Sequence, residues 1–245
     1  MQNDMPSKGS GAIASIPGAL RDYQSFLDLG PGGPPYNILG WLVAKICFNP
    51  FMRDRMGTRM YDLKIEAGEG AGFINNLDLR KGERPAMGTF AVPQRQINQW
   101  PSAEITTKFM AEYGTFLDRN SHLIDRVPSI LEARTDAAHV CQRVHLTPVA
   151  RQMRREICHV HEQSEHSVHV TLAPTDCKKV IEAGWGERFP LAGSRVVRNI
   201  TLGKIGVLPT EYVFVYAPRN DEEIAIVMEI VKASVQYVTG MSDVR

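Results

Sequence analysis

The sequence predicts a single α+β domain in which helices pack on one face of a mainly antiparallel sheet. Helical and strand patterns are mixed along the 245 residues without strict alternation of the two. With 43% hydrophobic and 22% charged residues, the composition is that of a globular protein with a core of normal size. We expect the domain to span 21–240, between a flexible Ser/Gly/Pro-containing lead-in of 1–20 and a short tail of 241–245.

Two segments in the second half have the pattern of strands. In "HSVHVTLA" the apolar and polar residues alternate, which places His169 on the face opposite Val168 and Val170. In "TEYVFVYAPR" the aromatic residues Tyr212, Phe214 and Tyr216 share one face by the same rule. Both segments therefore predict strands with two chemically different faces.

Capping residues mark the helices. The segment "NDEEIAIVMEIVKASVQYVTG" predicts a helix capped by Asn220 and ended by Gly240, and "PTDCKKVIEAG" predicts one closed by Gly184. A helix is expected over about Ser102–Leu117. Another is expected to start at Pro148, after Thr147 as its N-cap, and to run through "PVARQMRREICHVHEQ".

The first half carries weaker patterns. The segments "ERPAMGTFAVPQRQIN" and "SILEAR" predict strands. An apolar helix is expected from about Asn37 to Phe48, followed by Arg53, Arg55 and Arg59. Two interpretations stay open for it: a helix docked on the core with a basic flank, or an amphipathic helix that makes peripheral contact with a membrane.

Several function classes find no support. A formal net charge of +1 offers no general attraction for nucleic acid. The four cysteines are scattered without a CxxC pair, which indicates reduced thiols in a cytosol-facing protein. No run of about 18 apolar residues predicts a membrane span, so this chain is expected to be soluble. We find no nucleotide, flavin, nicotinamide or haem motif and no GxSxG elbow.

The densest polar feature is "HVHEQSEHSVHV", which holds four of the seven histidines. An imidazole titrates near neutral pH, so His169, fixed in a strand, is a candidate general base. His159 and His161 form an HxH pair that suits a metal only if the preceding helix ends by Cys158, because i and i+2 share a face in strands but not in helices. A purely structural role is the third interpretation, and we predict no metal site.

The segment "WGERFPLAG" is too apolar for an idle loop and too interrupted for a regular element. One interpretation is a packed corner, with Trp185 and Phe189 buried and Glu187 paired to Arg188 or Arg195. The other is a pocket wall, in which the Arg188 guanidinium holds an enolate or carboxylate oxygen and Trp185 stacks on an aromatic ligand.

Six segments, in order and over about Arg21–Thr239, resemble the fungal luciferase family. They are "RDYQSFLDLGPGGPPYN", "LRKGERP", "QRQ" at Gln94–Gln96, "REICHVHE", "GWGERFPLAG" and "PTEYVFVYAPRNDEE". The resemblance implies an oxygenase that oxidises 3-hydroxyhispidin, a styryl-pyrone, with molecular oxygen through a cyclic peroxide that loses carbon dioxide. It implies no metal or organic cofactor, and a full-length protein held at a membrane by an N-terminal anchor.

Together, the residues and the resemblance predict an enclosed site for a planar aromatic pyrone. We expect His169 or His161 to accept the proton from the substrate and Arg188 to stabilise the resulting anion. The walls are expected to come from Trp185, His159, Glu187, Phe189, Tyr212, Phe214 and Tyr216. A protein that binds small aromatic metabolites without turning them over is the alternative.

The chain departs from the family pattern at one position of this site. The family segment usually reads "HPLAG", and Phe189 stands where that histidine falls. The segment "GPGGPPYN" also resembles that of relatives from fungi that do not glow. The resemblance therefore covers non-luminescent homologues as well as light-emitting ones.

Overall fold

A six-stranded antiparallel sheet, in the order β1-β2-β3-β4-β6-β5, lies at the centre of the computed structural model, which describes residues 18–245. The strands are β1 (Ile124–Pro128), β2 (Asp136–Val140), β3 (Glu156–Val160), β4 (Val168–Thr171), β5 (Gly186–Arg188) and β6 (Tyr212–Val215). The predicted α+β class is confirmed. Most of the expected lead-in, residues 1–17, lies outside the described residues, and 18–20 begin the first helix.

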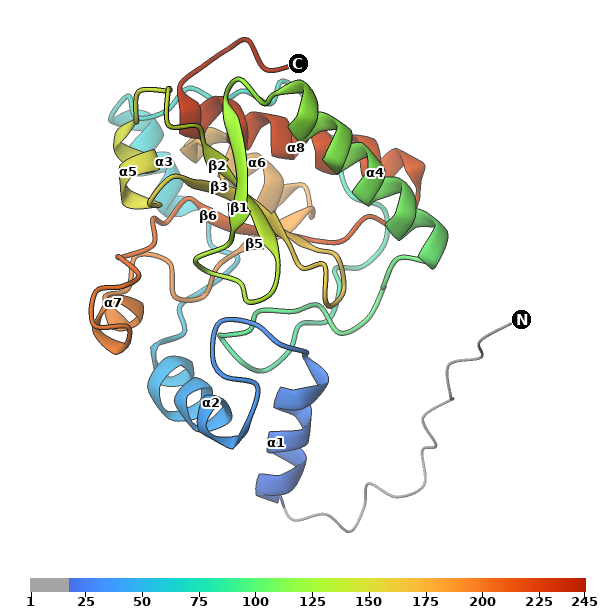
Figure 1. Ribbon diagram of the computed structural model, residues 1–245, viewed down its shortest axis with the longest axis vertical. Coiled ribbons are helices and arrows are strands. Elements are labelled where there is room, and N and C mark those ends of the chain that lie inside the picture. Colours follow the sequence, from blue (N-terminus) through green and yellow to red (C-terminus); the bar gives the residue numbers. More distant parts are fainter. Residues whose placement is uncertain (1–17) are drawn as a thin grey trace.

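Helices surround this sheet (Figure 1). They are α1 (Gly18–Asp28), α2 (Ile38–Leu42), α3 (Arg59–Glu66), α4 (Ala103–Arg119), α5 (Pro148–Gln152), α6 (Pro174–Glu182), α7 (Val196–Ile200) and α8 (Asp221–Thr239). A π-helical segment, η2 (Val43–Phe48), and a 3-10 turn, η3 (Asn49–Phe51), follow α2 directly. Figure 1 shows α4 and α8 side by side at one end of the molecule, with α1 and α2 at the other.

Both predicted ends of α8 are confirmed. The Asn220 side chain accepts a hydrogen bond of 2.9 Å from the backbone N–H of Glu223, and Gly240 ends α8 at φ +72°. Such a left-handed residue costs little only when it is glycine. Ser102 caps α4 in the same way as Asn220 caps α8, through the N–H of Ile105. These caps satisfy backbone donors that the helices themselves leave free.

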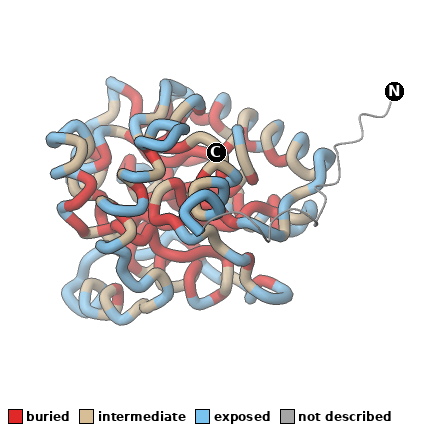
Figure 2. Tube along the Cα trace, turned by 90° about the horizontal axis from the view of Figure 1, so that it is seen from below, coloured by how far each residue is buried: buried red, intermediate tan, exposed pale blue. Residues whose placement is uncertain are grey.

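The sheet separates two apolar layers. On one face, α4, α6 and α8 pack on Val168, Val170 and their strand neighbours in the main core. On the other face, a smaller cluster gathers Phe48 and Phe189 around Tyr212. Figure 2 shows the buried residues running through the middle of the molecule, with exposed residues at its periphery. The second face is the one that carries the candidate site.

The helix predicted from Pro148 is much shorter than expected. It ends at Gln152, and Arg154 and Arg155 adopt positive φ of +54° and +79°, which breaks the helical path. The following residues, which the sequence favoured as helix, instead form the fully buried strand β3 between β2 and β4. Pairing on both sides and complete burial outweigh the weak helical preference of this segment.

The two strands predicted in the first half are wrong. The segment 83–98 contains only an isolated bridge between Met87 and Gln96. Gln94, Arg95 and Gln96 are all buried, and their side chains bond to Glu187, Glu132 and the backbone N–H of Ala217 respectively. The segment 129–134 is the turn that joins β1 to β2.

The apolar segment 37–48 docks on the protein through one side only. Ala44 and Phe48 are buried, while Leu39 and Ile46 are 65% and 63% exposed. The segment is therefore docked on the core through the side that carries Ala44 and Phe48, and its other side leaves an apolar surface exposed. Among the described residues, no helix has both the length and the apolar character needed to cross a membrane.

Candidate functional site

Strand register places side chains from four strands in one row on the second face of the sheet. His159 of β3 pairs with His169 of β4, His169 pairs with Phe214 of β6, and Phe214 pairs with Glu187 of β5. Residues directly opposite one another in an antiparallel sheet point to the same face. His161, two residues after His159, joins them at the start of the hairpin to β4.

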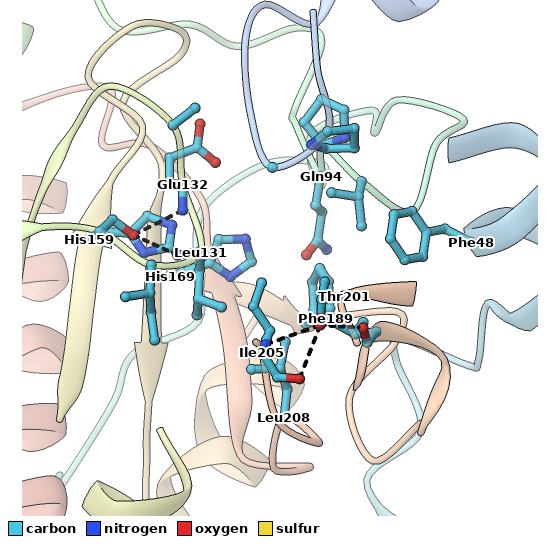
Figure 3. A pocket seen from close by; sticks show the side chains of 18 of the residues that line it. Phe48, Gln94, Leu131, Glu132, His159, His169, Phe189, Thr201, Ile205 and Leu208 are labelled. Carbon is cyan, nitrogen blue, oxygen red and sulfur yellow. Dashed lines mark hydrogen bonds between the residues drawn. The ribbon is translucent and has the colours of Figure 1, made fainter. Parts of the chain in front are cut away.

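This row lies beside a cavity of about 430 Å³. Its volume falls within the range of roughly 300–1,000 Å³ that is usual for small-molecule sites. Figure 3 shows His159, His169 and Glu132 on one side of the cavity and Phe48 on the opposite side. Further apolar lining comes from η2, α7 and the loop after it, through Val43, Val197, Ile200, Ile205 and Leu208. The cavity therefore has a polar end at the sheet and an apolar end under the surrounding loops.

Three imidazoles meet at the polar end. The ring centroids lie 5.4 Å apart for His159 and His161, 5.3 Å for His159 and His169, and 5.0 Å for His161 and His169. All three are buried. Nε2 of His159 and Nδ1 of His169 have no hydrogen-bond partner. Polar atoms that are buried and unpaired are uncommon, and they cluster where a ligand or ion completes them.

Carboxylates support two of these rings from behind. Nδ1 of His159 donates to Glu156 at 2.7 Å, and Nδ1 of His161 lies 3.0 Å from Glu165. Glu156 also accepts hydrogen bonds from the Ser129 hydroxyl and the Ile130 N–H. Burial raises the pKa of Glu156, but the hydrogen bond and charge of His159 and those two donors outweigh it and lower the pKa overall. Each carboxylate fixes the orientation of its imidazole.

Arg95 brings a buried guanidinium to the same end of the cavity. One of its terminal nitrogens donates to Glu132, and the other lies 3.1 Å from both ring nitrogens of His161. Its Nε lies 3.5 Å from Glu165, a contact that is an ion pair without a hydrogen bond. Arg95 therefore sits between two carboxylates and holds a positive charge at the cavity wall.

Burial sets the protonation of this cluster. It lowers the pKa of His169 and His161 well below the usual range, and the positive charge of Arg95 acts in the same direction. Both rings are therefore neutral at pH 7. Burial also raises the pKa of Glu132, against the lowering effect of Arg95.

Aromatic rings enclose His169. Tyr212 stacks on it, with 4.6 Å between the centroids and 8° between the planes. The edges of Phe189 and Phe214 complete the enclosure, with centroids 5.7 Å and 5.3 Å from that of His169. The cavity is lined by His159, His169, Phe189 and Tyr212. Phe214 contacts His169 but does not line the cavity.

The structure does not bring Arg188 to this cavity. Because Glu187 points to the cavity face, its strand neighbour Arg188 points to the opposite face. There its guanidinium donates a hydrogen bond of 2.8 Å to the carbonyl of Gly57 and another to the carbonyl of Asp54. It also lies over the ring of Tyr61. The guanidinium that lines the cavity belongs to Arg95.

Three other predicted wall residues, Trp185, Glu187 and Tyr216, also do not line the cavity. Trp185 lies in the main core and donates its indole N–H to the backbone carbonyl of Asp78, so this part of "WGERFPLAG" is a packed corner. Glu187 accepts hydrogen bonds from Gln94 and from Arg55, so its arginine partner is neither the predicted Arg188 nor Arg195, and the Tyr216 hydroxyl donates to it. Glu187 therefore touches the cavity only through Gln94, which lines it.

Sequence reasoning missed Arg95, Glu132, Glu156 and Glu165 as parts of the site. Glu156 and Glu165 could have been found, since each stands within four residues of a histidine that the sequence had already singled out. The signal for Arg95 was the polar run "QRQ" inside an otherwise apolar segment. Glu132 gave no sequence signal, because the turn that carries it has no recognisable pattern.

Comparisons with known proteins cover nearly the whole chain. A family model described as Luciferase domain matches residues 154–234, which include β3, β4, β5 and β6. The luciferase of Armillaria mellea is 34% identical over 254 residues, covering 94% of this chain and 86% of the relative. The luciferase of Neonothopanus nambi is 32% identical over 252 residues, covering 94% of this chain and 84% of the relative.

The luciferase of Armillaria ostoyae is 33% identical over the same shares as that of Armillaria mellea. No solved structure matches. Identity above 30% over almost the full chain is more than a shared fold requires. The family expected from six ordered segments is thereby confirmed, and the chain belongs to the fungal luciferase family.

Proposed function

We propose that this protein is an oxygenase that adds molecular oxygen to a flat hydroxypyrone of the 3-hydroxyhispidin kind, without a metal or organic cofactor. The observation that carries the proposal is the meeting of His159, His169 and the Arg95 guanidinium at one end of an otherwise apolar cavity of about 430 Å³. The relatives reported above are luciferases, which supports an oxidative reaction.

The shape and polarity of the cavity suit such a substrate. A pyrone with an aromatic arm is planar, acidic at one end and apolar along the rest. The polar end of the cavity offers donors and acceptors from His159, Arg95 and Glu132, and the apolar end offers Phe48 and Leu208. We infer that the hydroxypyrone ring lies against the histidines and that the aromatic arm extends toward Phe48.

The proposed chemistry begins with proton transfer. His169 takes the enol proton on its unpaired Nδ1, and the electron-rich enolate passes electrons to O2. The new carbon–oxygen bond leaves a peroxide anion, which takes the proton back from the imidazolium, so that substrate and O2 sum to a hydroperoxide. The enolate supplies the negative charge that stabilises the protonated imidazole next to it.

Arg95 is the proposed anion-holding group. Its guanidinium is held in place by Glu132, by the carbonyl of Gln94 and by the carbonyl of Pro31 at 2.9 Å. A donor that is already oriented stabilises charge without reorganising during the reaction. The apolar lining keeps out water, which would otherwise protonate the enolate or compete for the arginine.

An oxygen-uptake assay tests this function. Purified protein is mixed with 3-hydroxyhispidin in air-saturated buffer, and oxygen consumption and light are recorded together. We expect protein-dependent oxygen uptake that saturates with pyrone concentration. Binding of the pyrone by calorimetry without any oxygen uptake would contradict the proposal.

One observation favours the alternative of a binding protein without turnover. Phe189 presents an apolar edge to His169 at the position where the family segment usually carries a histidine. If that imidazole were needed for proton transfer, the cavity would still bind the pyrone. The same assay separates the two, because only the oxygenase consumes oxygen.

We further propose that the exposed side of 37–51 contacts a membrane surface from the cytosol. Ile38, Leu39, Ile46 and Phe51 are exposed large apolar residues, and the exposed Arg53 follows them. Apolar side chains beside a basic residue suit insertion at an anionic lipid interface. The same segment contributes Val43 and Phe48 to the cavity wall, so this surface adjoins the site.

A further inference from the structure

We propose that His159, His161 and His169 form a binding site for one divalent transition-metal ion of the zinc class. One ligand atom of each residue lies within 4.8 Å of the others, and all three residues are buried. Neutral imidazole nitrogen is a preferred ligand of Zn²⁺ and of neighbouring metals in the same series. An HxH pair can bind one metal only if the preceding helix ends by Cys158. This condition is met, because the helix ends at Gln152 and His159 and His161 lie on extended chain.

The spacing of the rings fits a tetrahedral ion. With metal–nitrogen bonds of about 2.0–2.1 Å, three imidazoles on one tetrahedral ion have their centroids roughly 5.2 Å apart. The observed separations of the ring centroids are 5.4, 5.3 and 5.0 Å. The donor atoms themselves must approach to about 3.3 Å. The rings therefore need to turn about their side-chain bonds to bring the donor atoms together, while the separations of their centroids already suit the ion.

The surroundings of the rings have a second property of metal sites. Metal-bound histidines usually donate their other ring N–H to a carboxylate, which fixes the tautomer and directs the free lone pair at the ion. Here Glu156 accepts from Nδ1 of His159, and Glu165 lies at Nδ1 of His161. Nε2 of His159 is left buried and unpaired, as is Nδ1 of His169.

One residue opposes the ion. The Arg95 guanidinium lies 3.1 Å from Nε2 of His161 and must move off that nitrogen before a metal can bind there. Arg95 keeps Glu132 and two backbone carbonyls as partners after such a shift. The fourth metal position faces the cavity, which His159 and His169 line, so water or a ligand oxygen can complete the tetrahedron.

Metal binding and turnover exclude each other at this site. The ion occupies the nitrogen lone pairs that the proposed oxygenase uses as proton acceptors, so a bound ion inhibits oxygen uptake. This consequence rests on the proposed function, whereas metal binding itself does not. The two are therefore tested by separate measurements.

Cobalt absorption tests the binding site. Co²⁺ is titrated into metal-free protein, and the intense visible bands of four-coordinate Co²⁺ are recorded. We expect one equivalent to bind with these bands, and Zn²⁺ to displace it. His159→Gln and His169→Asn are each expected to weaken binding at least tenfold, and Glu156→Gln about 10–100-fold. Two ligand variants guard against one that fails to fold, which circular dichroism reveals.

Two matched controls remove other sources of cobalt binding. His145→Ala changes an exposed histidine outside the cavity, and Cys47→Ser changes the half-buried thiol of η2. Both are expected to retain the full cobalt spectrum. Absence of four-coordinate bands in the wild-type protein would overturn the proposal. So would bands that persist in both folded ligand variants or disappear in Cys47→Ser.

The inhibitory effect is measured on the same preparations. With metal-free protein and 3-hydroxyhispidin in air, a saturating amount of Zn²⁺ is expected to lower oxygen uptake at least tenfold, and EDTA to restore it. Unchanged uptake at saturation, or uptake that EDTA abolishes, overturns the inhibitory role. Metal-free protein that binds Co²⁺ but consumes no oxygen refutes the proposed function and leaves the metal site standing.

Discussion

The imidazole of His169 lies flat on the phenol ring of Tyr212, with 4.6 Å between the centroids and 8° between the planes. The two residues come from neighbouring strands, β4 and β6. A stacked neighbour limits rotation of the imidazole, so the proposed base is oriented before any substrate arrives. The pairing of β4 with β6 therefore fixes the orientation of the His169 imidazole, while burial keeps that imidazole neutral.

This stack yields a prediction about turnover. His169→Asn removes the proton acceptor and is expected to lower pyrone-dependent oxygen uptake about 100-fold or more, the usual contribution of a general base. Tyr212→Phe keeps the stacked ring and is expected to keep most of the uptake, whereas Tyr212→Leu loses it in part. Oxygen-electrode kinetics check the series. Equal uptake by His169→Asn and wild type would remove His169 from the mechanism.

Phe189 offers the opposite test, a gain of function. Phe189→His places a further imidazole beside His169 and Tyr212, whose ring centroids lie 5.7 Å and 5.5 Å from that of Phe189. If a base at this position assists deprotonation, oxygen uptake and light both rise in the variant. Phe189→Leu serves as the control for a change of cavity shape alone. A decrease in both readouts with Phe189→His would show that the apolar edge itself is required.

Arg188 and Arg95, both of them buried, allow an effect on stability to be distinguished from an effect on the reaction. Arg188→Lys leaves carbonyls of Gly57 and Asp54 with poorer donors, and we expect a loss of about 1–3 kcal/mol in the free energy of unfolding with little change in KM. Arg95→Lys is expected to reduce kcat, because a lysine cannot hold the guanidinium geometry at the cavity wall. Urea unfolding and steady-state kinetics on both variants measure the contrast. A loss of kcat confined to Arg188→Lys would reverse the assignment.

Acid sensitivity of the fold is expected at Glu223, which joins the start of α8 to Arg80 and Arg219. Burial raises its pKa, but hydrogen bonds from Arg219 and the charge of Arg80 outweigh this and lower the pKa below 4.5. A group whose folded pKa is lowered stabilises the protein above its unfolded pKa, and this contribution is lost as the pH falls through the folded value.

Glu223→Gln measures that contribution. The variant is expected to be less stable than wild type by about 1–3 kcal/mol at pH 7, and the difference is expected to shrink as the pH falls below about 4.5. Thermal and urea unfolding between pH 3 and pH 7 supply the comparison. A difference that stays constant across this range would show that Glu223 acts by packing rather than by charge.

The exposed apolar surface predicts binding to lipid. Leu39→Ser combined with Ile46→Ser is expected to weaken binding to vesicles that contain anionic lipid about 100-fold or more, since burial of one leucine or isoleucine contributes about 1.5–3 kcal/mol and the two together contribute about 3–6 kcal/mol. Leu79→Ser, at a leucine elsewhere that is 75% exposed, against 65% for Leu39, is the matched control. Vesicle flotation measures the bound fraction. Loss of binding in the control alone would assign the contact to another surface.

Sequence patterns located the most regular parts of this site. Alternation in β4 placed His169 opposite Val168 and Val170, and alternation in β6 placed Tyr212 and Phe214 on one face. The register then shows that His169 and Phe214 are direct partners. Such patterns are reliable because a strand buried on both faces still separates its side chains by period two. Capping residues located α8 for a similarly local reason.

Non-local contacts decided the rest. The residues after Gln152, which were expected to continue a helix, form β3 instead, because they pair with strands on both sides. No local sequence pattern encodes that pairing. Arg188 was placed in the pocket because its segment was interpreted as a loop, while β5 gives it the opposite face to Glu187. Arg95 reaches the histidines from a turn 66 residues earlier in the chain, so only the folded structure brings them together.

The row formed by His159, His169, Phe214 and Glu187 makes the protein intolerant of changes in strand length. Inserting one residue at the start of β4 would turn His169 toward the helices and Val170 toward the cavity, and it would do so without altering any neighbouring strand. Natural length variation among homologues should therefore concentrate in the connections between strands, such as 201–210. Libraries built to alter substrate preference should vary residues in these connections and keep the four strands at constant length.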